Sequence, residues 1–441
     1  MSLETPERIR SLQKKLYLKA KSEPDFRFYL LYDKVWREDI LEHAYVVARA
    51  NRGAPGVDGV SFAAIEAGGR KEWLTGIRTA LRERTYRPDP VRRVMIPKPN
   101  GGERPLGIPT IRDRVVQTAV KLVIEPIIEA DLEPNAYGYR PGRSAGDAIA
   151  AVRALLRRGH TDVVDADLTK YFDTIPHDQL MRSVARRIVD RDLLKVIKMW
   201  LRAPVEETDG NGRKRLTGGK RHKRGTPQGG VISPLLANLY MNRFLKHWRL
   251  TEQGHRLKAQ VIAYADDFVI LSRGHADEAR VWAGEVMRRL GLSLNETKTA
   301  VRNAHRERFD FLGYSFGPHY SPRTGQRYLG ASPSKKSVTR LKPRISAILH
   351  RGNNEPWAGV CVRLNRLLKG WAGYFSYGTC TPAYRAIDNH VAMRVRQFLV
   401  KRHRVSSHGT ERYSHDVVFG KLGVLNLRTL QAARPQAWAL R

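Results

Sequence analysis

Two adjacent aspartates near the middle of the chain, Asp266 and Asp267, stand between two apolar runs. These runs, Val261–Ala263 and Phe268–Leu271, predict short strands. Because neighbouring residues on a continuous strand point to opposite faces, two adjacent carboxylates can serve one site only where the chain turns. The pattern therefore predicts a strand–turn–strand hairpin with both acids at its tip.

A third carboxylate, Asp167, ends another apolar run well upstream and could meet the hairpin tip in the fold. Three carboxylates that converge in a basic protein indicate two divalent metal ions and phosphate chemistry on nucleic acid. Plainer interpretations stay open at this point. An Asp-Asp pair is common in turns, and an aspartate at a strand end often caps the following helix.

The charge balance of the chain is extreme. Of its 441 residues, 79 are Lys or Arg and 43 are Asp or Glu, which gives a net charge of +36. Such a charge favours a polyanionic partner, RNA or DNA, over a membrane surface. With 41% hydrophobic residues, the chain is expected to bury a sizeable core in roughly two to four domains.

The sequence also bears on the compartment. No apolar run approaches membrane-spanning length, and residues 1–23 mix acids and bases without the apolar stretch of a secretory signal. The acids in this segment also argue against a mitochondrial transit peptide. The only cysteines, Cys361 and Cys380, are too few for a zinc ribbon or a disulfide framework. We therefore expect reduced thiols in a cytoplasmic protein.

Apolar periodicity predicts the main elements. Helices are expected over residues 26–50, 65–84, 112–130, 146–157, 234–249 and 277–290, and from a cap at Asp178 to Val189. Further strands are expected over residues 91–96 and 309–316, and helices from about residue 335 onward. Residues 211–224 are predicted to form a loop that carries seven basic residues and no acid: Arg213, Lys214, Arg215, Lys220, Arg221, Lys223 and Arg224.

Seven sequence blocks follow one another along the chain: ANRGAPGVDGV (50–60), IPKPNGGERPLGIPTIRDR (96–114), DADLTKYFDTIPHDQL (165–180), GTPQGGVISPLLANLYMNRF (225–244), YADDFVIL (264–271), GLSLNETKT (291–299) and FDFLGYSF (309–316). In this order they resemble the reverse transcriptases encoded by bacterial group II introns. LLKGWAGYFSY (367–377) and the basic stretch to Arg404 look like the maturase, or X, segment of that family. The resemblance covers nearly the whole chain.

This resemblance implies an α+β fold, a right-hand polymerase with fingers, a palm with an antiparallel sheet, and a helical thumb, followed by a helical basic C-terminal region. The domains expected from it are an N-terminal extension with a template-side block (1–60), fingers and palm (61–325), thumb and maturase (326–410) and a short basic tail, a candidate DNA-binding remnant (411–441). Many relatives carry a Cys/His-rich endonuclease after the maturase segment. The sequence shows no such motif, so cutting of the second target strand is not expected.

The resemblance also implies roles for particular residues. Asp167, Asp266 and Asp267 would hold two Mg²⁺ ions, one lowering the pKa of a primer 3′-hydroxyl and one holding the triphosphate and the leaving pyrophosphate. The nucleotide itself would meet Lys98 and Arg104 at its triphosphate, Phe172 at its 2′-carbon and Gln228 beside it. Without the resemblance, Lys98 and Arg104 would be interpreted as a solvated turn and Phe172 as an ordinary core residue.

The expected function is an RNA-directed DNA polymerase that copies intron RNA and assists its splicing and mobility (retrohoming). Its expected partners are the intron RNA template, a DNA primer or target, and deoxynucleoside triphosphates, with no membrane. The basic loop is expected to contact phosphates, although a merely solvated loop would have the same composition. Two alternatives remain open: a non-enzymatic splicing cofactor built on an inactive polymerase, and a domesticated reverse transcriptase in host defence or repair. No Walker-type phosphate loop occurs, which excludes a P-loop ATPase.

Overall fold

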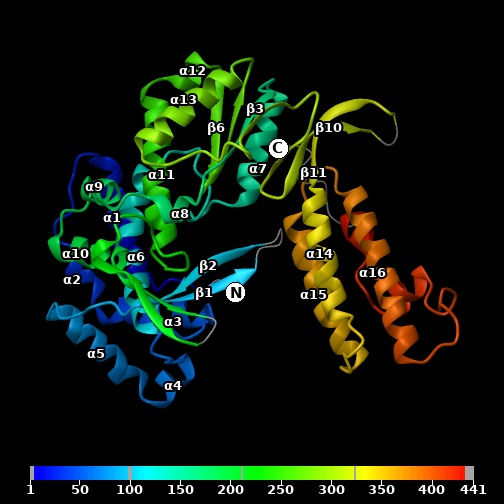
Figure 1. Cartoon of the computed structure of the whole chain (residues 1–441), viewed down its shortest axis with the longest axis horizontal. Helices are drawn as coiled ribbons and strands as arrows, with labels where there is room; N and C mark the ends of the chain where they lie inside the picture. The colour runs from blue at the N-terminus through cyan, green and yellow to red at the C-terminus, as the bar shows by residue number, and fades with distance from the viewer. Residues whose placement is uncertain (1–3, 98–101, 210–211, 322–323, 433–441) are drawn as a thin grey trace.

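The computed structural model describes residues 4–97, 102–209, 212–321 and 324–432. Figure 1 shows an N-terminal body of sheets and helices beside a C-terminal body of helices that begins at α14 (Lys335–Ile348). Helices and largely antiparallel sheets are segregated along the chain, which confirms the predicted α+β class. Across these described ranges, no helix is long and apolar enough to span a membrane.

The first helices pack around α6 (Ile111–Asp131), which is apolar on most sides and correspondingly buried. The predicted helix over 26–50 is wrong in its first part, because residues 26–31 are not helical. Asp190 accepts hydrogen bonds from the backbone nitrogens of Leu31 and Tyr32, both at 2.8 Å, and these bonds hold the segment outside a helix. The helices here are α1 (Glu7–Ser22), α2 (Tyr32–Val35), α3 (Glu38–Ala50), α4 (Phe62–Ala67) and α5 (Arg70–Arg82).

One four-stranded sheet has the strand order β2-β1-β4-β5. Its strands are β1 (Val91–Pro97), β2 (Glu103–Ile108), β4 (Pro204–Thr208) and β5 (Lys214–Gly218). The prediction of a loop over 211–224 is therefore wrong for β5. Arg215 stands directly opposite Glu207 of β4, and Lys214 pairs with Glu206 at 3.1 Å, so a basic strand is stabilised by an acidic neighbour. The segment continues through a short 3₁₀ helix, η1 (Gly219–Arg221).

A second four-stranded sheet, in the order β6-β7-β3-β8, forms the palm. Its strands are β3 (Asp162–Asp167), β6 (Ala259–Tyr264), β7 (Asp267–Ser272) and β8 (Ala300–Asn303). Alternate residues of β3 enter two apolar clusters, so both faces of the sheet are covered. Helix α7 (Ala145–Arg157) packs on one face, and α11 (Ser233–Leu250) and α13 (Ala276–Arg289) pack on the other.

Three helices follow β3 in the chain: α8 (Tyr171–Thr174), α9 (His177–Ala185) and α10 (Arg191–Leu201). The prediction that Asp178 caps a helix running to Val189 is wrong. Pro176 takes the N-cap position, Asp178 lies in the first turn, and α9 ends at Ala185. Proline suits this boundary because its fixed φ angle favours a helix start.

A third sheet, in the order β11-β10-β9, connects the two bodies. Its strands are β9 (Phe309–Phe311), β10 (Tyr314–Tyr320) and β11 (Arg327–Pro333). The prediction of one strand over 309–316 is wrong, because the chain turns at Leu312 and Gly313, which have φ angles of +50° and +78°. Glycine adopts such angles without steric cost, and it makes the tight turn between antiparallel strands possible.

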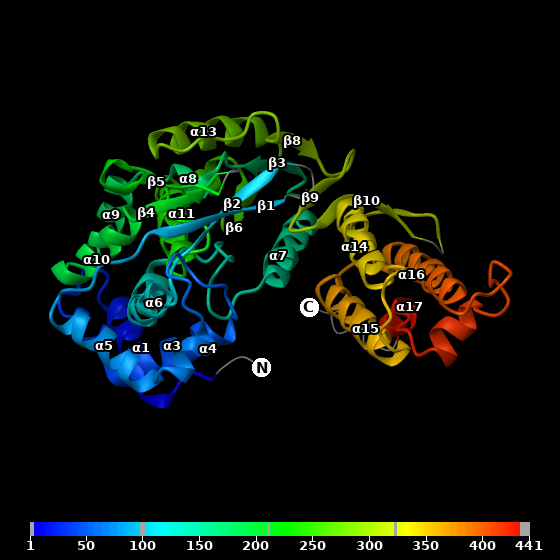
Figure 2. The same cartoon turned by 60° about the horizontal axis from the view of Figure 1, so that its bottom comes forward.

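The C-terminal body has its own apolar cluster, built mainly by α14, α15 (Trp357–Tyr374) and α16 (Thr381–Arg402). Figure 2 shows these helices, with α17 (Leu427–Ala432), grouped apart from the N-terminal body. Tyr413 and Val418 are buried in the same cluster, so we propose that this body includes residues beyond 410. Cys361 and Cys380 are also buried in it and form no disulfide.

Candidate active site

The three predicted carboxylates lie where β3 ends and the β6–β7 hairpin turns. Asp167, the last residue of β3, is the direct cross-strand partner of Asp267, the first residue of β7. Paired residues on antiparallel strands project from the same face, so these two side chains are neighbours. Asp266 sits in the two-residue turn, which is made possible by a φ angle of +60° at Ala265. The structure thus confirms the predicted hairpin, while the metal-binding role stays a prediction.

The surroundings disfavour the charged forms of Asp266 and Asp267. Burial, with repulsion from Asp165, Asp266 and Asp167, raises the pKa of Asp267 to about 7. Burial also raises the pKa of Asp266, and the positive charge of Arg104 opposes this shift. Sequence reasoning missed Asp165, whose pKa burial raises to about 6. Asp165 and Asp167 share a face of β3, so four carboxylates are gathered in one place.

The segment after α13 fixes the end of β3. The backbone oxygen of Asp167 accepts a hydrogen bond from Asn295 N at 2.7 Å, and Lys298 Nζ lies 3.2 Å from Asp167 Oδ2. Lys298 thus offsets part of the local negative charge. In the part of the chain that the structure describes, no three His, Cys, Asp or Glu side chains stand close enough to hold one ion as they are. The carboxylate oxygens are nevertheless the ligand type that Mg²⁺ takes.

A loop between α6 and α7 supports the hairpin tip and was also missed. A Cβ atom on Gly138 would lie 2.5 Å from Ala265 N, so only glycine lets the two backbones approach this closely. The ring of the next residue, Tyr139, lies 6.5 Å from that of Tyr264. Burial, together with Asp266, raises the pKa of Tyr139. The run of glycine, proline and tyrosine over residues 135–144 signals a turn, but only the contacts reveal what it supports.

A chain of hydrogen bonds joins β2 to α8 through Gln228. Arg104 Nε donates to Gln228 Oε1 at 2.7 Å, and Gln228 Nε2 donates to Asp173 Oδ1 at 3.2 Å. Gln228 O also accepts a hydrogen bond from Gly107 N. The structure therefore brings together two of the predicted nucleotide-binding residues, and Arg104 is close enough to Asp266 to affect its pKa. Lys98, another of the four predicted nucleotide-binding residues, lies outside the described residues.

A cavity of about 240 Å³ adjoins this chain of hydrogen bonds. Its lining includes Lys170, Asp173 and Gln228. Phe172 itself is only 6% exposed, and its backbone oxygen accepts a hydrogen bond from Thr226 N at 2.7 Å. Its ring makes an edge contact with Tyr171 in the main core. The proposed contact of Phe172 with the sugar therefore stays a prediction.

The seven basic residues predicted to bind phosphates are spread over several elements. Lys214 and Arg215 lie on β5, Arg213 precedes it, and Arg221 ends η1. Arg224 donates a hydrogen bond to Gly291 O at 3.3 Å. Lys220 belongs to η1, and Lys223 lines a separate groove. Their contact with phosphates stays a prediction.

Comparisons with known proteins place this geometry in a family. The family model described as reverse transcriptase (RNA-dependent DNA polymerase) matches residues 96–316, and that of the group II intron maturase-specific domain matches residues 338–414. The chain belongs to the group II intron-encoded reverse transcriptases. A reverse transcriptase domain followed by a maturase domain is the combination that acts in intron splicing and mobility.

The chain is also similar to individual known proteins. Protein YkfC of Escherichia coli is 34% identical over 386 residues, covering 77% of this chain and 98% of the relative. The group II intron-encoded protein LtrA of Lactococcus lactis is 28% identical over 352 residues, covering 65% of this chain and 56% of LtrA. Among solved structures, a telomerase from Candida albicans has a TM-score of 0.41 and 14% identity over 81% of this chain and 70% of that one.

Proposed function

We propose that this family member is an active RNA-directed DNA polymerase. The observation that carries the proposal is the meeting of Asp167, Asp266 and Asp267 at adjoining strand ends, with Arg104 of β2 near Asp266. An arginine fork suits the oxygens of a triphosphate, and the acids suit divalent cations. Supporting this, all three positions carry carboxylates, a ligand type that Mg²⁺ takes.

The acids would hold two Mg²⁺ ions in the working enzyme. Burial and mutual repulsion raise the pKa of Asp267, and divalent cations would offset that repulsion. When bound, such ions lower the pKa of a hydroxyl nucleophile and stabilise the leaving pyrophosphate. The protein would then contribute by orientation: β3 and the hairpin fix the carboxylates, while Arg104 and Gln228 fix the nucleotide.

The partners follow from the same proposal. The template would be intron RNA, the primer a DNA strand at the target, and the substrates deoxynucleoside triphosphates. The maturase-matched helical body would bind the intron RNA during splicing, in the bacterial cytoplasm. Its residues from Arg340 to Arg412 include 14 Lys or Arg against 3 Asp or Glu, a balance that suits RNA phosphates.

Primer extension on poly(rA)/oligo(dT) with dTTP and Mg²⁺ tests the proposal. Asp266→Ala should abolish extension and leave RNA binding nearly unchanged, because it removes a metal ligand without removing a cation. Asp277→Ala, on the exposed first turn of α13, is the matched control and should extend normally. Fe²⁺-directed backbone cleavage offers a second readout, and cleavage near Asp167 should disappear with Asp266→Ala. Robust extension by that variant would contradict the metal assignment.

A further inference from the structure

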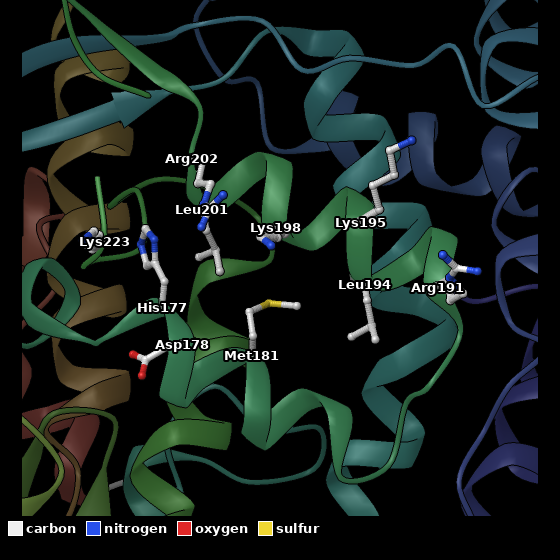
Figure 3. Close-up of a pocket in the computed structure, with 10 residues that line it drawn as sticks. All are labelled: His177, Asp178, Met181, Arg191, Leu194, Lys195, Lys198, Leu201, Arg202 and Lys223. Atoms are coloured by element: carbon white, nitrogen blue, oxygen red, sulfur yellow. The ribbon is translucent and has the colours of Figure 1, made fainter. Parts of the chain in front are cut away.

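A groove of about 690 Å³ lies between α9 and α10, outside the carboxylate site. Figure 3 shows Met181 of α9 rising between Leu194 and Leu201 of α10. These three side chains give the groove an apolar floor. The volume falls within the range of roughly 300–1,000 Å³ that is typical of small-molecule sites, so a nucleobase fits it easily.

The rim of this groove is cationic. Figure 3 shows His177, Arg202 and Lys223 at one end and Arg191 and Lys195 at the other. Counting the remaining lysine, Lys198, the lining holds five Lys or Arg residues and one acid, Asp178.

Acids close to the groove in sequence have partners elsewhere. Asp192 of α10 pairs with Arg84 at 2.8 Å. Asp190 caps α10 and accepts hydrogen bonds from the backbone of Leu31 and Tyr32. Neither acid lines the groove, so its positive charge is left largely uncompensated.

A second cationic hollow lies on the other side of α9. It has a volume of about 530 Å³, and its lining includes Arg182 of α9, Arg186 at the C-terminal end of that helix, Arg243 of α11 and Arg289 of α13. The one acid in that lining, Asp131, is paired with Arg187 at 3.2 Å. Helix α9 is therefore flanked by positive charge on both sides, which extends the cationic surface beyond the α9–α10 groove.

This surface is remote from the helical body. In both Figure 1 and Figure 2, α9 and α10 lie on the side of the molecule opposite α14, α15 and α16. None of Asp167, Asp266 and Asp267 lines the groove. A nucleic acid could therefore occupy the groove while another occupies the carboxylate site.

We propose that the α9–α10 groove is a docking site for single-stranded RNA, separate from the polymerase site. One unpaired base would pack against the apolar side chains of Met181, Leu194 and Leu201, and the rim cations would hold the flanking phosphates. RNA is favoured over a protein partner because the whole chain carries a net charge of +36 and the apolar floor is bordered by phosphate-binding side chains. The site goes beyond the proposed polymerase function, because binding here needs neither the carboxylates nor a metal ion.

The test uses the full chain and a fluorescein-labelled twelve-residue oligo(rA), with a blunt RNA–DNA duplex in excess to fill the polymerase site. Lys195→Gln/Lys198→Gln should make the plot of log K against log salt shallower by about 1.4, since each lost single-strand contact contributes about 0.7. Lys14→Gln/Lys15→Gln on α1 removes the same charge elsewhere and should change neither slope nor affinity. Circular dichroism confirms that each variant is folded.

A second variant separates apolar packing from charge. Met181→Gln should weaken oligo(rA) binding about fivefold, because a polar amide replaces an apolar surface against which the base packs, and it should leave binding of inorganic polyphosphate unchanged. Primer extension at saturating duplex should be normal in both groove variants, so a failed docking site is distinguishable from a failed polymerase. Equal salt slopes in parent and lysine variant, an equal loss in the α1 control, or no effect of Met181→Gln would each overturn the proposal. Groove-dependent binding of polyglutamate without binding of oligo(rA) would indicate an acidic protein partner instead.

Discussion

At the scale of single residues, the carboxylate of Asp173 determines how the side-chain amide of Gln228 is oriented. An ionised carboxylate only accepts, so its partner at 3.2 Å must be the Nε2 donor of Gln228. The carbonyl of the same amide is thereby turned toward Arg104 Nε, 2.7 Å away. Asp173 therefore fixes which way the amide of Gln228 faces, and it holds a guanidinium near the expected position of the triphosphate.

Asp173→Asn should raise the KM for dTTP about threefold to tenfold and change kcat little. An asparagine can donate as well as accept, so the amide of Gln228 loses its single orientation, at a cost of about one hydrogen bond. Steady-state primer extension gives both constants. Asp277→Asn on α13 serves as the control for a lost surface charge. An unchanged KM would mean that Asp173 does not position Gln228 during nucleotide binding.

Phe172→Ala should raise the incorporation of ribonucleotides relative to deoxynucleotides, because the proposed wall at the 2′-carbon is gone. The ring is buried, so the substitution should also cost about 3–5 kcal/mol of stability, which thermal unfolding measures. Phe172→Tyr keeps the ring and should keep the ratio near that of the parent. If the ratio does not change in a folded Phe172→Ala protein, sugar selection depends on another residue.

At the scale of elements, the hairpin tip depends on a loop that belongs to a different part of the chain. Gly138 lies against the backbone of Tyr264 and Ala265, and Asn238 of α11 donates a hydrogen bond to Gly138 O. The turn that carries Asp266 therefore rests on a loop that α11 in turn holds in place.

Gly138→Ala should reduce primer extension by about a hundredfold, since a shift of about 1 Å in a catalytic group can cost that much. The added methyl would lie 2.5 Å from Ala265 N and 2.9 Å from Tyr264 C, so the tip must move. Gly76→Ala on α5 is the matched control, because no atom lies within 4 Å of its new methyl. This control should extend normally and gain up to about 1 kcal/mol in stability. Normal extension by Gly138→Ala would show that the tip tolerates the displacement.

Sequence patterns predict best the elements that are marked by their own residues and do not depend on residues elsewhere in the chain. The helices over 112–130, 146–157, 234–249 and 277–290 appear within two residues of their predicted bounds, because each repeats apolar residues at helical spacing. The strand β5 was missed because its basic residues are stabilised by Glu206 and Glu207 on another strand. The carboxylates Asp167, Asp266 and Asp267 were found because they mark strand ends, whereas Asp165 stood out only once burial was known.

The net charge of +36 acts on the molecule as a whole. RNA binding should weaken steeply with salt, by a slope of roughly 0.7 to 0.9 in log K against log salt for each neutralised phosphate. Replacing the seven basic residues of the 211–224 segment with glutamine should flatten that slope and leave primer extension at saturating template intact. A filter-binding titration at several salt concentrations measures the slopes. Identical slopes for variant and parent would leave these residues with a role in solubility only.

The two bodies are joined by tyrosines as well as by the chain. Tyr374 of α15 donates a hydrogen bond to Leu312 O at 2.9 Å, and Tyr314 of β10 donates one to Tyr374 O at 2.7 Å. The turn at Leu312 also supplies a backbone hydrogen bond to Asp267. One set of contacts therefore runs from the helical body to the palm carboxylates through the two-residue turn at Leu312 and Gly313, which sequence periodicity alone did not predict.

The two cysteines allow opening of the helical body to be measured by thiol alkylation. Both Cys361 and Cys380 lie in its apolar cluster, and the sequence contains no other thiol. Cys380 is only 1% exposed, so a maleimide or iodoacetamide reagent should reach its thiol only when this body opens, and the alkylation rate of Cys380 under native conditions reports the free energy of that opening. An RNA that binds to these helices would slow alkylation, and an RNA that binds elsewhere would not. The measurement needs no label engineered into the protein.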